Sequence, residues 1–119
     1  MIKTEKTIYE PKEAKDGQRV LVMSIWPRGI SKNKIDLWLK ELGTDKALIK
    51  KWKAGKVSWA EFRKEYLKSL KGKEALLKKL AQESKKQTIT LLCSCKDEKQ
   101  CHRSLLKAVI EVQAKILTK

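Results

Sequence analysis

The sequence is poor in several residue types, and each shortage excludes something. Its 119 residues include only one histidine, four arginines, two prolines and three cysteines. A small, odd number of cysteines argues against a secreted scaffold held by disulfide bonds, so we expect reduced thiols. The chain also lacks a signal peptide and any apolar run that approaches the length of a membrane span. These absences predict a cytoplasmic protein that does not associate with membranes.

Negative charge is scarce too, because 29 lysine and arginine residues outnumber 14 aspartate and glutamate residues and give a net charge of +15. A positive field of this size attracts polyanions, and nucleic acid is the obvious partner. Enrichment in lysine and glutamate is also typical of heat-adapted proteins, so a thermostable composition remains an alternative. Because arginine is rare, the two arginines in distinctive motifs, Arg28 and Arg103, are informative.

What the sequence does contain is an alternation of apolar strands and amphipathic helices. The runs 19–25 and 88–93 are nearly continuous in apolar residues, as in strands covered on both faces. A first short strand is predicted at 6–11. Apolar spacing and terminal glycines predict helices at 34–43, 44–55, 58–72 and 73–84, and from about 97 to the C-terminus. The pattern predicts a single α/β domain over residues 1–119, rich in helix. Its small, mostly parallel sheet would be flanked by about five helices.

Two local signals support the helical assignments. In the segment 34–43, apolar residues recur at the spacing i, i+3, i+4, i+7, namely at Ile35, Trp38, Leu39 and Leu42. In the segment 58–72, Ser58 precedes Glu61 by three residues, which is the spacing of a capping box at a helix N-terminus.

The last predicted strand leads into a segment with all three cysteines and the only histidine. Zinc is the first hypothesis for this segment, with Cys93, Cys95, Cys101 and His102 as ligands. Their spacing differs from the usual two pairs of ligands, and adjacent residues on a helix point about 100° apart. We therefore expect no metal and no other cofactor, with these four side chains as the ligands if a metal is bound.

Cysteine chemistry is the second hypothesis. A thiol at a helix N-terminus, near Arg103 and Lys96, would have its thiolate stabilised by the helix dipole and by positive charge. However, the loop has no glycine and differs in spacing from the phosphate-binding loops of cysteine phosphatases and rhodaneses. Packed thiols are the plainer interpretation, with Cys101 turned inward beneath Leu105. Cys101 is the second catalytic candidate after His102.

The third hypothesis is an anion site at the carboxyl edge of the sheet. Residues 26–29 follow one predicted strand and residues 94–103 follow another, so both segments should meet at one edge. Positive side chains would hold the anion, Trp26 would stack on a base or sugar, and His102 would move a proton if chemistry occurs. The positive side chains are Arg28, Lys96 and Arg103.

The hypothesis about function follows from this site. We expect the chain to bind, and where chemistry occurs to hydrolyse, a phosphate-bearing ligand, either a nucleotide or a nucleic-acid end. The ligand would lie in a cleft between Arg28 and His102. The alternative is a non-catalytic basic module that binds nucleic acid or an acidic protein.

Several motifs resemble the YeaO-like family, a DUF488-type domain of unknown function. The resemblance covers about residues 19–111 and is carried by "RVLVMSIWPRGISKNKIDLWLKELG", "LIKKW", "WAEFRKEYLKSL" and "ITLLCSCKDEKQCHRSLL". It implies a single cytoplasmic α/β domain and no established reaction. The most widely shared matches are 26–29, Lys96, Asp97 and His102. Cys95 lies outside the pattern, one branch of the family lacks Cys93 and Cys101, and residues 22–24 stand where many members have Val-Asp-Arg.

Overall fold

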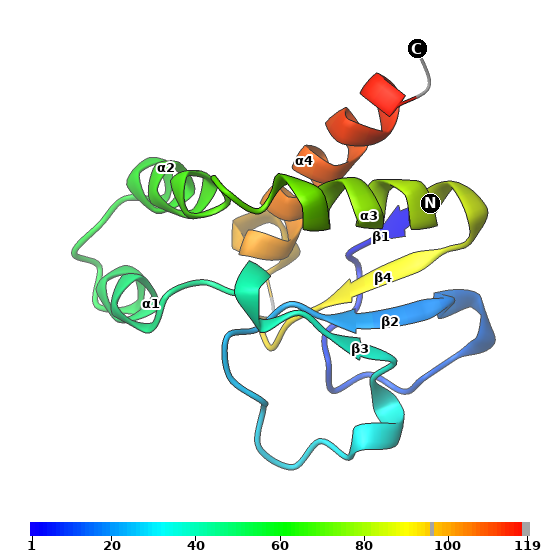
Figure 1. Cartoon of the computed structure of the whole chain (residues 1–119). Coiled ribbons are helices and arrows are strands. Elements are labelled where there is room, and N and C mark those ends of the chain that lie inside the picture. Colours follow the sequence, from blue (N-terminus) through cyan, green and yellow to red (C-terminus); the bar gives the residue numbers. More distant parts are fainter. Residues whose placement is uncertain (96, 118–119) are drawn as a thin grey trace.

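Four parallel strands form the centre of the protein, whose structure, a computed structural model, describes residues 1–95 and 97–117 (Figure 1). The strands are β1 (Ile2–Lys3), β2 (Gln18–Leu21), β3 (Leu37–Trp38) and β4 (Ile89–Leu92). Their order in the sheet is β1-β4-β2-β3, and every neighbouring pair is parallel. The carboxyl ends of the two central strands, β4 and β2, therefore lie side by side at one edge.

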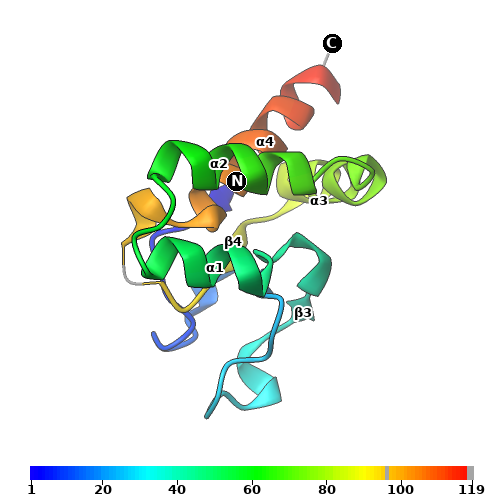
Figure 2. The same cartoon turned by 90° about the vertical axis from the view of Figure 1, so that its left-hand side faces the viewer.

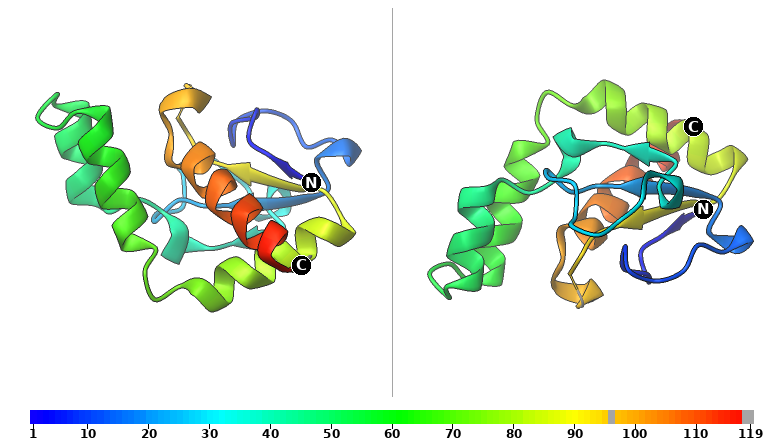
Figure 3. Two further views of the ribbon diagram at one scale, coloured as in Figure 1. Left: turned by 90° about the horizontal axis from the view of Figure 1, so that it is seen from above. Right: turned by 90° about the horizontal axis from the view of Figure 1, so that it is seen from below.

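The described part of the chain contains four α-helices. They are α1 (Lys46–Lys53), α2 (Trp59–Ser69), α3 (Glu74–Lys86) and α4 (His102–Leu117). Helices α3 and α4 pack together over one face of the sheet (Figures 1 and 3). Helices α1 and α2 form a pair beyond the carboxyl ends of β2 and β4, which Figure 2 places in front. Within the described residues, no helix has both the length and the apolar character needed to cross a membrane.

The two central strands are buried on both faces. Successive side chains of a strand point to opposite sides, so each strand contributes to a core on each face. Val20 and Leu91 contribute to the larger core under the helices, whereas Leu21 and Leu92 contribute to a smaller core on the opposite face. This double burial explains the unbroken apolar runs that predicted the strands. The α/β class and the parallel sheet are confirmed.

The predicted helix at 34–43 is wrong, and this error accounts for the count of about five helices. The segment instead contains strand β3 and one short 3-10 turn, Lys40–Leu42, and it begins at the end of another, Lys32–Lys34. Leu37 pairs with Val20, and the Leu39 N–H donates to the Leu21 carbonyl at 2.9 Å. Pairing with β3 satisfies the main-chain groups along the edge of β2. This pairing outweighed the helical spacing of the apolar side chains.

The predicted strand at 6–11 is also displaced. The strand is β1, and the segment that follows it turns so that Ile8 is buried and its N–H donates to the Cys93 carbonyl at 3.0 Å. Other local predictions are confirmed. The capping box forms at the start of α2, where the Ser58 hydroxyl accepts from the Glu61 N–H at 3.1 Å.

Candidate active site at the carboxyl edge of the sheet

The cysteine segment forms a compact turn between β4 and α4. Cys93 follows the last residue of β4, and the Asp97 carboxylate caps a 3-10 turn by accepting from the Lys99 N–H at 3.0 Å. Cys101 is extended, with φ −138° and ψ 146°, and α4 begins at His102. The final helix thus starts five residues later than predicted from Asp97, because the segment first turns back towards the sheet.

This turn gathers the three thiols. The sulfur atoms of Cys93, Cys95 and Cys101 all lie within 4.8 Å of one another. The Sγ atoms of Cys93 and Cys95 are 3.5 Å apart. Cys93 and Cys101 are buried and Cys95 is exposed, and all three are free thiols. The cluster therefore has a buried floor and one member that faces solvent.

The His102 ring is fixed against this cluster from the other side. Its Nε2 lies 2.5 Å from the Val22 carbonyl oxygen, which can only accept, so Nε2 bears the proton. In the neutral ring Nδ1 then holds the lone pair. Nδ1 lies 3.9 Å from Cys93 Sγ and 3.8 Å from Cys101 Sγ. The ring edge of Tyr66 packs beside it, with centroids 5.3 Å apart. The imidazole is thus oriented to act on two thiols.

Arg103 points inward and not to an exposed anion site as the sequence predicted. Its side chain is buried, and Nε donates to the Thr4 carbonyl at 2.8 Å. Nη1 donates to the Cys95 carbonyl at 2.9 Å and to Cys101 Sγ at 3.3 Å. Within residues 1–95 and 97–117, no carboxylate forms an ion pair with this guanidinium. A fixed positive charge therefore lies beside the thiols.

The thiols differ in acidity because of their neighbours. The hydrogen bond with the Cys101 thiol lowers the pKa of Cys93 far below its usual range, and Cys95 and His102 act in the same direction against burial. The same bond with Cys93 raises the pKa of Cys101, and Cys95 and burial add to this effect. The direction of these effects favours the thiolate form at Cys93. The sequence placed Cys101 second to His102 among the catalytic candidates, whereas these surroundings favour Cys93 among the thiols.

A cavity of about 640 Å³ opens above the cluster. Cys93, Cys95, Cys101 and His102 line one part of it. Helix α1 lines another part with Lys46, Lys50 and Lys53, and Trp52 and Phe62 form an aromatic wall. The cavity thus combines three lysines, one aspartate, aromatic surface and cysteine thiols. The α1 lysines follow the spacing i, i+4, i+7 of one helix face, which was the signal in the sequence that could have indicated them.

Thr44 is the other residue that the sequence analysis missed. It is 2% exposed, lines the cavity, and is the one described residue with a buried side-chain oxygen or nitrogen that has no hydrogen-bond partner. Buried hydroxyl groups are normally satisfied, so an unpaired one beside a cavity can hydrogen-bond to a ligand there. Glycine at position 43 permits this placement of Thr44, because the main chain there passes very close to Ser24. A Cβ atom at Gly43 would lie only 2.1 Å from the Ser24 main-chain nitrogen.

Trp26 and Arg28 do not line this cavity, so the predicted cleft between Arg28 and His102 must be corrected. Trp26 borders a second pocket, where its ring packs edge-on against Trp38 at 5.4 Å and its Nε1 donates to the Ile30 carbonyl. Arg28 is exposed and lines neither pocket. The cavity is bounded instead by residues 23–25, immediately before Trp26. Lys96 lies outside the described residues.

Comparisons with known proteins identify the family. The family model described as "Active DUF488-N3 subclade" matches residues 2–114. The chain belongs to the DUF488 family. Uncharacterized protein YeaO of Escherichia coli is 42% identical over 103 residues, which are 85% of this chain and 90% of that protein. The YeaO-like resemblance is thereby confirmed.

Relatives with lower sequence identity match over a similar length of the chain. Uncharacterized protein Rv3073c of Mycobacterium tuberculosis is 30% identical over 107 residues, covering 87% of this chain and 88% of that protein. Uncharacterized protein Mb3100c of Mycobacterium bovis matches to the same degree. No solved structure matches the chain significantly.

Proposed function

We propose that this DUF488 protein binds a phosphate-bearing ligand in the cavity and hydrolyses it with Cys93 as the nucleophile. The observation that supports this most is the orientation of His102. The Val22 carbonyl holds the ring so that Nδ1 faces the Cys93 sulfur at 3.9 Å. A thiol beside an oriented imidazole is the arrangement that activates cysteine nucleophiles. The word "active" in the family description agrees with a site that performs chemistry.

Three features of the cavity favour an anionic ligand. The lysines Lys46, Lys50 and Lys53 line it, and the N-terminus of the 16-residue helix α4 lies at its floor. The unpaired Thr44 hydroxyl can donate to a phosphate oxygen. The aromatic wall of Trp52 and Phe62 would accept a base or another flat group. A nucleotide or a nucleic-acid end fits this combination.

The proposed reaction has two steps. In the first, the Cys93 sulfur forms a bond to phosphorus while the ester P–O bond breaks. The electron pair of that bond stays on the ester oxygen, which takes a proton from water. In the second step a water molecule attacks phosphorus, the S–P bond breaks, and Cys93 returns as thiolate together with inorganic phosphate. Where Cys93 begins as a thiol, His102 Nδ1 takes its proton. Because this chemistry needs reduced thiols, we also propose a cytoplasmic location.

The test measures turnover of 4-nitrophenyl phosphate by the reduced protein. Cys93→Ser should abolish turnover and still bind a nucleoside monophosphate. Lys50→Ala should weaken that binding several-fold, whereas Lys85→Ala, an exposed lysine on α3 away from the cavity, should not. Turnover that survives in Cys93→Ser would contradict the proposal. If the wild type has no turnover but binds nucleic acid with a steep salt dependence, the non-catalytic basic module is correct.

A further inference from the structure

We infer that Cys93, Cys95, Cys101 and His102 form a site for one zinc ion. The inference rests on the positions of four ligand atoms and holds whether or not Cys93 is a nucleophile. Zinc in proteins is bound tetrahedrally, with bonds of about 2.3 Å to sulfur and about 2.0–2.1 Å to nitrogen, which separates the ligand atoms by roughly 3.5–3.8 Å. The three sulfur atoms already lie within 4.8 Å of one another, and Cys93 and Cys95 are 3.5 Å apart.

His102 completes the set with its free nitrogen. Nδ1 lies 3.9 Å and 3.8 Å from the sulfur atoms of Cys93 and Cys101, close to the separation of ligands on one zinc ion. Histidine ligands usually donate their other N–H to a carbonyl or carboxylate, which fixes the ring. The Val22 carbonyl performs this role for Nε2. The imidazole is therefore already fixed at ligand separation from Cys93 and Cys101, and the exposed Cys95 side chain would have to adjust to place its sulfur on the same ion.

The backbone at Cys101 removes the main objection that the sequence raised against zinc. Adjacent residues on one helix would point about 100° apart. Cys101 is extended, however, and α4 begins at His102, so the two side chains converge and are not fixed at a helical angle. The exposed position of Cys95 gives the ion a path from solvent.

Charge balance provides an independent argument. Zinc with three thiolates and a neutral imidazole has a net charge of −1. A buried ion without a counter-charge is costly, and Arg103 is buried with no carboxylate partner in the described part of the chain. Its Nη1 donates to Cys101 Sγ at 3.3 Å, the kind of hydrogen bond that stabilises a metal-bound thiolate. Zinc binding would thus supply the negative charge that Arg103 lacks.

A zinc ion with four protein ligands has no open position, so the site would be closed. Binding would release the protons of the thiols that are still protonated. It would also occupy Cys93. We therefore expect zinc to inhibit any chemistry of the Cys93 thiolate, and the metal-bound and reactive forms to exclude each other.

The test titrates reduced, metal-free protein with Co²⁺ under anaerobic conditions and then displaces it with Zn²⁺. We expect one ion per chain and the intense visible absorption of tetrahedral cobalt bound to thiolates. Cys95→Ser should weaken binding at least tenfold, and its exposed position makes a folding defect avoidable. Ser94→Ala, a neighbour in the same turn, should bind like the wild type. Circular dichroism should show the same fold in both variants.

Two results would overturn the inference. One is the absence of tetrahedral cobalt–thiolate absorption at one equivalent of metal. The other is equal affinity in Cys95→Ser and the wild type, which would exclude the proposed ligand set. Neither result would contradict the proposed reaction, because turnover that depends on Cys93 does not require a bound metal. Conversely, metal binding without any turnover would remove the proposed function alone.

Discussion

Two buried arginines, at opposite ends of the sheet, show how this protein treats buried charge in two ways. Arg19 is the second residue of β2, near the amino ends of the strands, and Arg103 lies in the first turn of α4 at the carboxyl ends. Both side chains are almost fully buried. Arg19 Nη1 forms an ion pair with Asp16 at 2.6 Å, whereas Arg103 donates only to main-chain carbonyls and a thiol.

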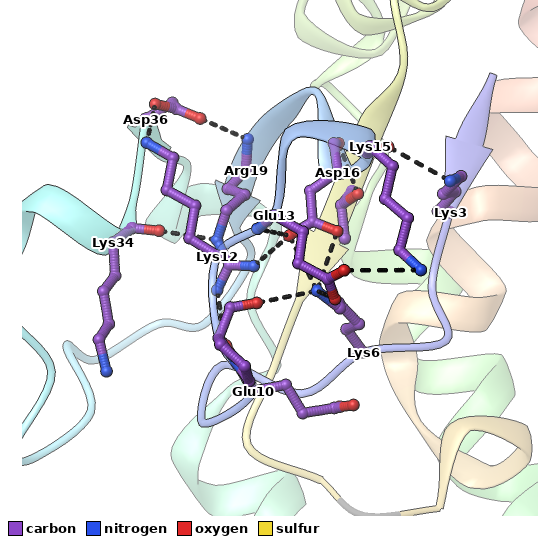
Figure 4. A network of polar contacts seen from close by, with 12 residues as sticks. Lys3, Lys6, Glu10, Lys12, Glu13, Lys15, Asp16, Arg19, Lys34 and Asp36 are labelled. Carbon is purple, nitrogen blue, oxygen red and sulfur yellow. Dashed lines mark hydrogen bonds and ion pairs between the residues drawn. The ribbon is translucent and has the colours of Figure 1, made fainter.

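The Arg19 region forms a closed polar network (Figure 4). Asp16 also accepts from Lys6, which in turn pairs with Glu13 at 2.7 Å, and the Arg19 main-chain N–H donates to Asp36 at 2.7 Å. Burial alone would raise the pKa of Asp16, but hydrogen bonds from the Glu13 N–H, Lys6 and Arg19 outweigh it and lower the pKa. The buried charges of Asp16 and Arg19 are thus matched to each other, so this region stabilises the fold.

The Arg103 region is the opposite, because its positive charge lies against the Cys101 sulfur and has no carboxylate partner among the described residues. Such a charge must be balanced by a thiolate, by a metal bound to thiolates or by an anionic ligand. The two ends of the sheet therefore differ, because a buried cation without a carboxylate partner lies only at the end with the candidate site among the described residues. Four predictions test this difference between the Arg19 and Arg103 regions.

The largest effect is expected from Asp16→Ala. It leaves the Arg19 guanidinium buried without a carboxylate and removes one of the two acidic partners of Lys6, the other being Glu13. Breaking a buried pair on one side typically costs about 3–5 kcal/mol of the free energy of unfolding. Urea denaturation followed by circular dichroism measures this. As a control, Lys12→Ala removes an exposed partner of Asp36 and should cost no more than about 1 kcal/mol. Similar losses in both variants would mean that the network is not a buried unit.

Acid should remove part of the same stabilisation. The pKa of Asp16 is lowered in the folded protein from its ordinary value of 3.8, so folding favours the carboxylate. Its contribution is fully present above the unfolded pKa and is lost as the pH falls through the folded pKa. We expect the urea midpoint of the wild type to decline below about pH 4, and that of Asp16→Asn to decline less. Parallel declines would assign the acid sensitivity to other carboxyl groups.

At the other end of the sheet, Arg103→Met should affect stability less and chemistry more. Three hydrogen-bond acceptors lose their donor, which costs about 1–3 kcal/mol. We also expect slower alkylation of Cys93 by iodoacetamide and weaker cobalt binding, by roughly 10–100-fold for the metal. Arg103→Lys keeps the charge and should recover part of the alkylation rate. If alkylation is unchanged in Arg103→Met, the guanidinium has only a structural role.

The sequence predicted the strands and the members of the cysteine cluster better than the orientation of the site residues, for a physical reason. Strands β2 and β4 and the capping box at Ser58 depend on local patterns, and they were found. Residues 93, 95, 101 and 102 were also found, because they are close in the chain. Their orientation was not, because it depends on contacts that no local pattern records. His102 is held by a carbonyl 80 residues away, and Arg103 by one 99 residues away.

The same limit explains the errors. The spacing of Ile35, Trp38 and Leu42 was compatible with a helix, but the edge of β2 decided in favour of a strand. Trp26 follows β2 at the correct edge of the sheet, yet its ring packs against Trp38 and turns from the cavity. Thr44 and the α1 lysines come to the cavity through tertiary packing of a helix pair that the sequence could place only in order along the chain.

The smallest and most discriminating effect is expected at two buried threonines. Thr90 is satisfied, because its hydroxyl donates to the Asp16 carbonyl at 2.7 Å, whereas the Thr44 hydroxyl has no partner. Thr90→Val should therefore lower the free energy of unfolding by about 1 kcal/mol or more, since it removes a bond and leaves an acceptor buried.

Thr44→Val replaces an unpaired hydroxyl with a methyl group of similar size, so the free energy of unfolding should stay the same or rise slightly. The cost should appear in ligand affinity instead. If Thr44 donates to a phosphate oxygen in the cavity, Thr44→Val should weaken binding of a nucleoside monophosphate about 5–10-fold, and Thr90→Val should not weaken it. Paired urea and calorimetric titrations measure both quantities. A Thr44→Val protein that loses stability as Thr90→Val does would mean that water satisfies this hydroxyl, and the amino and carboxyl ends of the sheet would then treat buried polar groups alike.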